Sequence, residues 1–126
     1  MNWALHHSSL ITSNLESAKH FYVDVLGLPL DESRPDMGFD GLWFDMAAGQ
    51  QIHLLRLPNP EAGIDRPEHG GRDRHIALLT DDLEAVVAKL EQHNVTYSRS
   101  KSGRAALFCR DPDGNAIEII QREKRC

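Results

Sequence analysis

The chain has 126 residues, of which 40% are hydrophobic and 26% are charged, a composition typical of a small globular protein. Its formal net charge is −5, from 14 Lys and Arg against 19 Asp and Glu, and this excludes the broad basic face that nucleic-acid binding requires. Its apolar runs are too short to span a membrane and its first ten residues lack an export signal, so we expect a cytoplasmic protein.

Two segments of the chain resemble each other. His7–Glu16 and His75–Glu84 share five identical residues in ten aligned positions at a constant offset. Each segment begins with a short apolar stretch, meets a helix-start signal and continues into a helical pattern. The sequence therefore predicts a duplicated structural unit.

The first copy predicts one strand, one helix and three further strands. Its first strand begins at His7, and the helix that follows has capping-box spacing between Ser13 and Glu16 and a stop at Gly27. Strand-like segments follow at 30–34, 41–46 and 51–57. The apolar face of the helix consists of Leu15, Ala18, Tyr22 and Val25.

The second copy repeats this order after a linker at 58–74 that is rich in proline and glycine. Asp81 and Glu84 mark the start of its helix, and Asn94 can adopt the left-handed stop. Strands are expected at 96–100, 105–110 and 116–121, the last two joined by a tight hairpin at 111–115. The apolar stripe of this helix consists of Leu83, Val86, Val87 and Leu90.

These elements predict an α+β fold of two tandem βαβββ modules. Module one covers 1–57, the linker covers 58–74 and module two covers 75–122. We expect them to form a single domain over residues 1–126.

The alternation of side chains along each strand separates a helix-covered face from an open face. In the first strand of each copy, Leu10 and Leu78 occupy matching positions and should pack on the helix, which places His7 and His75 on the open face. In the last strands, His53 and Glu118 each lie between two apolar residues and should also face outward. The residues assigned to the core of these last strands are Ile52, Leu54, Ile117 and Ile119.

Three histidines and one glutamate thus occupy equivalent positions on the open faces of both copies, which predicts a metal site. Histidine is the commonest metal ligand in proteins. His6 should point to the opposite face, His20 and His93 lie on or at the end of helices, and His69 lies in the linker, so none of these is expected in the site. Gln51 is either a hydrogen-bond donor to a ligand or an ordinary polar residue.

Three further motifs reveal a resemblance to a known family. They are Asn14-Leu15-Glu16 with Phe21-Tyr22 and Leu26-Gly27-Leu28, His75-Ile76-Ala77-Leu78 leading into Asp82-Leu83-Glu84, and Asp111 to Glu118. With these motifs the chain resembles the vicinal oxygen chelate superfamily of glyoxalase I, fosfomycin-resistance enzymes, extradiol dioxygenases and bleomycin-binding proteins.

The resemblance implies a ligand set and an assembly. Its metal positions correspond to His7, His53, His75 and Glu118, although glyoxalase-type members usually carry glutamate where this chain has His53. It also implies a homodimer in which module one of one chain and module two of the other build each site.

Such a ligand set suits Zn, Ni, Co or Fe(II) better than Mg or Ca. The function expected is that of a glyoxalase-like lyase or isomerase, whose small substrate chelates the metal through two neighbouring oxygens while Glu118, or a released His53, moves the proton. The residues considered for holding an anionic substrate tail are Arg99, Lys101 and Arg104.

Two alternatives stay open at this point. An Fe(II) extradiol-type dioxygenase needs only three protein ligands, so it becomes the better interpretation if His53 does not bind metal. A binding protein of the drug-resistance type would need no metal. The four titratable side chains argue against it, because an apolar ligand cavity would not benefit from burying them. Fosfomycin-type thiol transfer is weaker, because segment 98–108 lacks the lysine and tyrosine that those members carry there.

Overall fold

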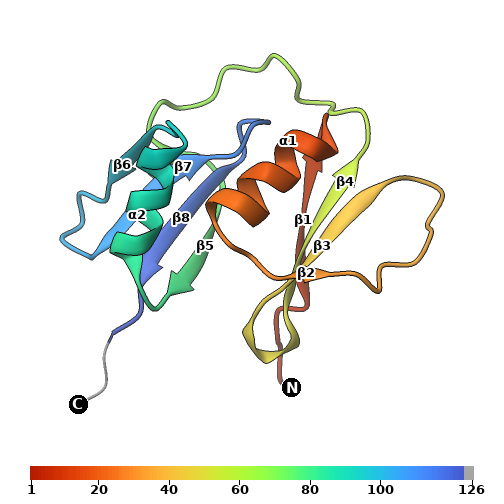
Figure 1. Ribbon diagram of the computed structural model, residues 1–126, viewed down its shortest axis with the longest axis horizontal. Coiled ribbons are helices and arrows are strands. Elements are labelled where there is room, and N and C mark those ends of the chain that lie inside the picture. The colour runs from red at the N-terminus through yellow and green to blue at the C-terminus, as the bar shows by residue number, and fades with distance from the viewer. Residues whose placement is uncertain (124–126) are drawn as a thin grey trace. The chain divides into compact units, whose positions relative to one another are not determined.

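The computed structural model describes residues 1–123, and it has the α+β fold of two βαβββ modules that the sequence predicts. The chain divides into two compact units: unit 1 is Met1–Ala62 and unit 2 begins at Gly63. Figure 1 shows that each unit pairs one sheet with one main helix. Within residues 1–123, no helix is both long and apolar enough to cross a membrane.

Unit 1 contains a four-stranded sheet with the strand order β1-β4-β3-β2. β1 runs parallel to β4, whereas the other neighbours are antiparallel. A short α-helix continues directly into a π-helical segment across the sheet. The elements are β1 (His7–Thr12), α1 (Leu15–Lys19), η1 (His20–Val25), β2 (Leu30–Asp31), β3 (Gly41–Asp45), η2 (Ala47–Gly49) and β4 (Gln51–Arg56).

Unit 2 repeats this topology with the strand order β5-β8-β7-β6. β5 is parallel to β8, and β7 is antiparallel to both β8 and β6. The elements are η3 (Gly70–Arg72), β5 (His75–Thr80), α2 (Leu83–Gln92), β6 (Tyr97–Arg99), β7 (Ala106–Arg110) and β8 (Ala116–Gln121).

Both main helices begin one residue later than the sequence predicts. Asn14, not Ser13, caps α1, because its Oδ1 accepts hydrogen bonds from the backbone N–H groups of Glu16 and Ser17 at 2.9 and 3.2 Å. Asp82, not Asp81, caps α2. In each pair the cap is the residue whose side chain accepts from backbone N–H groups of the first helical turn, and Asn and Asp are both strong N-cap residues.

The ends of both helices and the turn of the last hairpin are as the sequence predicts. Gly27 and Asn94 both have left-handed backbone, with φ of 73° and 57°. In the hairpin, Oδ1 of Asp111 accepts from the N–H groups of Asp113 and Asn115, both at 2.9 Å. The predicted strand at 30–34 is wrong beyond Asp31, where a side chain–backbone turn ends it.

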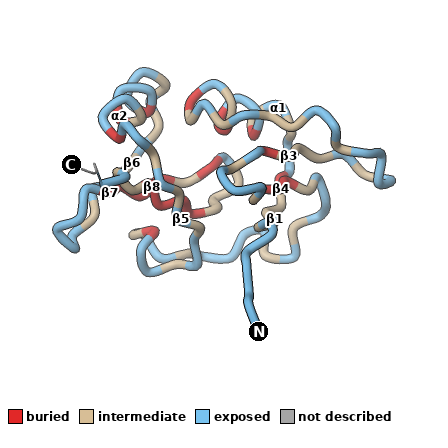
Figure 2. The backbone as a smooth tube through the Cα atoms, turned by 90° about the horizontal axis from the view of Figure 1, so that it is seen from below, coloured by how far each residue is buried: buried red, intermediate tan, exposed pale blue. Residues whose placement is uncertain are grey.

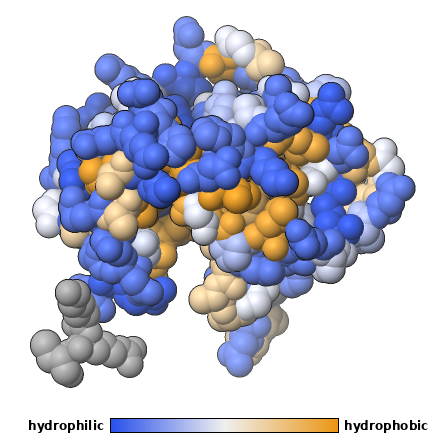
Figure 3. All heavy atoms as spheres, viewed as in Figure 1, coloured by the Kyte–Doolittle hydropathy of each residue, from blue (hydrophilic) through white to orange (hydrophobic). Residues whose placement is uncertain are grey.

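Each unit has a core between its sheet and its helix, visible as the buried segments in Figure 2. The side chains of Tyr22, Phe44 and Leu54 are fully buried in unit 1. Leu90 and Ile117 are fully buried in unit 2, and the predicted core residues of β4 and β8 are all buried. On the face shown in Figure 3, hydrophilic side chains surround the hydrophobic ones that reach the surface.

Candidate functional site

In unit 1, β1 and β4 bring His7 and His53 together. The parallel pairing sets Ser9 opposite His53, two residues beyond His7. The two imidazole rings stack with centroids 4.1 Å apart and an interplanar angle of 19°. We call these residues the His7–His53 pair.

Trp43 completes this arrangement from the other side of His53. It lies directly opposite His53 in the pairing of β3 with β4, and its ring stacks on the imidazole at 4.3 Å and 11°. Because β4 lies between β1 and β3, the His53 ring is held between the rings of Trp43 and His7. His53 is consequently only 8% exposed, although it lies on the face opposite the core residues.

Hydrogen bonds and burial define the chemical state of His53. Its Nε2 lies 2.8 Å from Oε1 of Gln51. Burial lowers the pKa of His53 below its ordinary value, and the neighbouring His7 and His6 lower it further. The neutral imidazole, which is the form that binds metals, is therefore favoured at neutral pH.

His6 does not lie where the sequence predicts. It is adjacent to the His7–His53 pair, with its Nδ1 2.8 Å from Nδ1 of His7 and the ring centroids 5.0 Å apart. β1 begins at His7, so His6 is outside the strand and strand alternation does not determine its direction.

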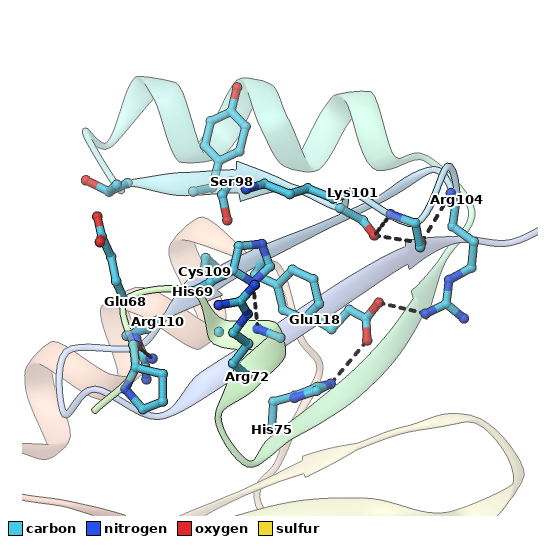
Figure 4. A pocket seen from close by; sticks show the side chains of 18 of the residues that line it. Glu68, His69, Arg72, His75, Ser98, Lys101, Arg104, Cys109, Arg110 and Glu118 are labelled. Carbon is cyan, nitrogen blue, oxygen red and sulfur yellow. Dashed lines mark hydrogen bonds and ion pairs between the residues drawn. The ribbon is translucent and has the colours of Figure 1, made fainter. Parts of the chain in front are cut away.

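In unit 2, β5 and β8 bring together His75 and Glu118, which we call the His75–Glu118 pair. Nε2 of His75 lies 3.3 Å from Oε1 of Glu118, and the Glu118 side chain is only 5% exposed. Arg104, on the loop before β7, donates from Nη2 to the other carboxylate oxygen at 3.1 Å. Figure 4 shows this line of contacts along the wall of a cavity.

A hydrogen bond of the other ring nitrogen of His75, Nδ1, indicates where the neutral ring carries its proton. Nδ1 of His75 lies 2.8 Å from the backbone oxygen of Asp73. A carbonyl oxygen only accepts, so Nδ1 carries the proton and Nε2 of the neutral ring is an acceptor. Two acceptors therefore converge at Nε2 and the carboxylate, and such a pair requires a proton or a metal cation between them.

A cavity of about 1140 Å³ lies in unit 2 beside this pair. Phe108 lies within it, 5.3 Å from the ring of His75 and 5.0 Å from that of His69. The cationic residues Arg72 and Lys101 line the cavity, and within residues 1–123 neither forms an ion pair. A ligand there would meet an aromatic surface and two available cations (Figure 4).

Of the three cations considered for an anionic tail, two line the cavity and one does not. Lys101 and Arg104 are lining residues. Arg99 pairs instead with Glu84 on α2, at 3.1 Å. Arg99 lies opposite the buried Leu107, so its side chain is on the helix-covered side of the sheet. The alternation of side chains was not used to assign faces to this strand.

The remaining candidates lie apart from the two pairs. His20 pairs with Asp24 on its own helix, and His93 is the C-cap of α2. Burial raises the pKa of the Cys109 thiol to about 12, so it stays protonated and is a poor ligand. Among residues 1–123, no three His, Cys, Asp or Glu side chains gather to hold a metal.

Besides His6, sequence reasoning missed Trp43, which stacks on His53, and Arg72, which lines the cavity of unit 2. Trp43 alternates with the buried Phe44 along β3, so strand alternation applied to that segment would have placed it beside His53. Arg72 lies in a 3-10 turn of the linker, where no periodic pattern signals its direction.

Comparison with known proteins agrees with the fold and the motifs. Residues 4–119 match the Glyoxalase/Bleomycin resistance protein/Dioxygenase superfamily. The protein YaeR of Escherichia coli is 33% identical over 94% of this chain and 95% of its own, and a lactoylglutathione lyase of Haemophilus influenzae is 30% identical over 93% and 91%. The crystal structure of TnmS3, an antibiotic binding protein from Streptomyces, superposes with a TM-score of 0.72 at 26% identity, covering 97% of this chain and 98% of that one. The chain belongs to the Glyoxalase/Bleomycin resistance protein/Dioxygenase superfamily.

Proposed function

We propose that this member of the superfamily is a metal-dependent, glyoxalase-like lyase or isomerase. Its small substrate would chelate the metal through two neighbouring oxygens. The observation that carries the proposal is the convergence of Nε2 of His75 and Oε1 of Glu118 at 3.3 Å, which are two lone-pair groups when the imidazole is neutral. Ligand bonds of about 2.1 Å at angles near 90–110° separate neighbouring ligand atoms by about 3.0–3.4 Å, so this spacing fits one shared cation.

The proposed ligands are His7, His53, His75 and Glu118. Three neutral imidazoles and one carboxylate suit Zn, Ni, Co or Fe(II). When bound, such an ion supplies Lewis-acid chemistry to a carbonyl oxygen of the substrate. The lowered pKa of His53 supports this role, because a ligand imidazole must be neutral.

Glu118 is the proposed base. It is buried at 4% exposure, and the 61%-exposed side chain of Arg104 holds one of its oxygens. Arg104 can swing into solvent more easily than the buried carboxylate can move, so Glu118 could exchange this partner for a substrate proton. His53 is the alternative base if it is released from the metal.

The cavity of unit 2 is the proposed substrate site. Arg72 and Lys101 would bind an anionic tail, while Phe108 would pack against its apolar part. The substrate would thus be a small molecule with an oxygen-rich head and an acidic end.

The proposed assembly is a homodimer. In it the His7–His53 pair of one chain and the His75–Glu118 pair of the other form each site, and the chain is a single domain of two modules. A closed twofold dimer is also the commonest assembly of small soluble chains.

A non-catalytic small-molecule binding protein is the second candidate. It is favoured by the aromatic surface that Phe108 presents to the cavity and by the likeness to an antibiotic binding protein. An Fe(II) extradiol-type dioxygenase would follow if His53 does not coordinate.

Elemental analysis of the purified protein, before and after incubation with Zn, Ni, Co and Fe(II), separates these functions. We expect metal to be retained and lactoylglutathione lyase activity to require it. Less than about a tenth of an equivalent with every metal would contradict the proposal and favour the binding protein. Oxygen consumption with a catechol, in the absence of lyase activity, would favour the dioxygenase.

A further inference from the structure

The side-chain amide of Gln51 has only one possible orientation. Its Nε2 lies 2.8 Å from Oδ2 of Asp31 and 2.9 Å from Oδ1 of Asp45. Ionised carboxylates only accept hydrogen bonds, so the NH₂ end of the amide must face them. The amide oxygen therefore points the other way, toward His53.

Asp31 is well suited to hold this orientation. The hydroxyl and the N–H of Ser33 both donate to its Oδ1, at 2.6 and 2.9 Å. These bonds, with a further one from Gln51, hold the pKa of Asp31 below its usual value. Asp31 is thus a carboxylate whose other oxygen, Oδ2, accepts from Gln51.

The orientation of Gln51 determines where the proton of His53 lies. Oε1 of Gln51 is an acceptor 2.8 Å from Nε2 of His53, so Nε2 must carry the hydrogen. A neutral imidazole has a single N–H, which leaves the lone pair on Nδ1.

We infer that Gln51, held by Asp31 and Asp45, is a positioning residue that keeps His53 in its Nε2–H form and makes Nδ1 the metal-binding nitrogen. This inference rests on the proposed function. It gives His53 the opposite arrangement to His75, where Nδ1 donates to the backbone oxygen of Asp73 and Nε2 of the neutral ring has the lone pair that faces Glu118. One site would thus use imidazoles through different nitrogens.

Imidazole nitrogen NMR tests the inference without any activity measurement. The full-length protein would carry ¹⁵N-labelled histidine and be studied metal-free, well above the ordinary histidine pKa of about 6.5. Long-range ¹H–¹⁵N correlations distinguish a protonated ring nitrogen from one with a lone pair. For His53 we expect a protonated Nε2 with an exchange-protected proton, and a lone pair on Nδ1. A protonated Nδ1 would overturn the inference.

The same spectrum after addition of Zn(II) identifies the coordinating nitrogen. We expect the Nδ1 resonance of His53 to shift while its Nε2–H proton remains, and the Nε2 resonance of His75 to shift. A shift of His53 Nε2 with loss of its proton would overturn the inference. If no histidine responds to any metal, the proposed function fails, yet the metal-free spectrum still decides the role of Gln51.

A matched pair of variants links the effect to the amide. Gln51→Met keeps the shape of the side chain but removes both hydrogen-bonding ends, and Gln50→Met makes the same change one residue earlier, outside this network. We expect Gln51→Met to lose the protected Nε2–H proton and to bind Zn(II) about 10- to 100-fold more weakly, as is usual when the partner of a ligand is removed. Gln50→Met should match the wild type. Equal behaviour of the two variants would contradict a positioning role.

Discussion

The two units share one topology but hold their site histidines by different means. In unit 1, His53 is packed between two aromatic rings and hydrogen-bonded to a neutral amide. In unit 2, His75 faces a buried carboxylate that also binds an arginine. Duplication therefore preserved the strand positions, while the chemistry around them diverged.

In the proposed metal site, this difference would give the two pairs different roles. The His7–His53 pair would offer uncharged ligands, and the His75–Glu118 pair would supply the negative charge that attracts a cation. Removing Glu118 or His75 should therefore weaken metal binding more than removing His53.

The largest effect is expected at the charged pair. Glu118→Ala and His75→Ala each remove a proposed ligand, so we expect metal affinity to fall by more than about 100-fold, which exceeds the loss usual when a hydrogen-bond partner of a ligand is removed. Competition with a chromogenic chelator measures this. His20→Ala, whose ring pairs with Asp24 on its own helix, is the control and should bind like the wild type. If Glu118→Ala bound metal as tightly as the wild type, the larger contribution expected from the His75–Glu118 pair would be contradicted.

A smaller effect is expected at His53. His53→Glu should retain metal and could raise lyase turnover, because it restores the carboxylate that glyoxalase-type relatives carry. His53→Ala should weaken binding less than Glu118→Ala does. If His53→Ala leaves the affinity unchanged, the site has two histidines and one carboxylate, and the dioxygenase becomes the better candidate.

Arg104 should matter to stability because its partner is buried. Arg104→Gln leaves the Glu118 carboxylate with one charge-assisted contact fewer, so we expect a loss of about 1 kcal/mol in the free energy of unfolding of the metal-free protein. Urea denaturation measures it. Arg99→Gln is the matched control in the same hairpin, where the partner Glu84 is 74% exposed, and it should leave the midpoint unchanged.

The smallest effect is expected in the pH dependence of the free energy of unfolding, to which His53 contributes. Its pKa is lower in the folded protein than in the unfolded chain, where it is about 6.5. Between these two values the unfolded chain binds more protons, so stability is full above about pH 6.5 and falls as the pH drops below it. Denaturation of metal-free protein at several pH values should show this slope, and His53→Gln should flatten it. An unchanged slope would mean that the imidazole is not held neutral.

Strand alternation in the sequence predicted that His7 and His53 lie together, and likewise His75 and Glu118. The structure adds the parallel pairing of β1 with β4 and of β5 with β8, which the sequence did not predict and which brings the two members of each pair side by side. What alternation could not predict is contact with residues from loops and edges. Asp31 reaches Gln51 from β2 across 20 positions of sequence, and Arg104 reaches Glu118 from a loop. Such contacts depend on where a turn ends, which no periodic pattern determines.

Metal stoichiometry in one variant from each pair tests the central claim most directly. Titration of metal-free protein with Co(II), followed by its visible absorption, should show about one equivalent bound per chain in the wild type. His7→Ala and Glu118→Ala should each weaken the binding of that same equivalent, because in the proposed site both pairs hold one ion. If Co(II) still binds Glu118→Ala with wild-type affinity, or if the two variants affect two separate equivalents, the pairs do not form one site.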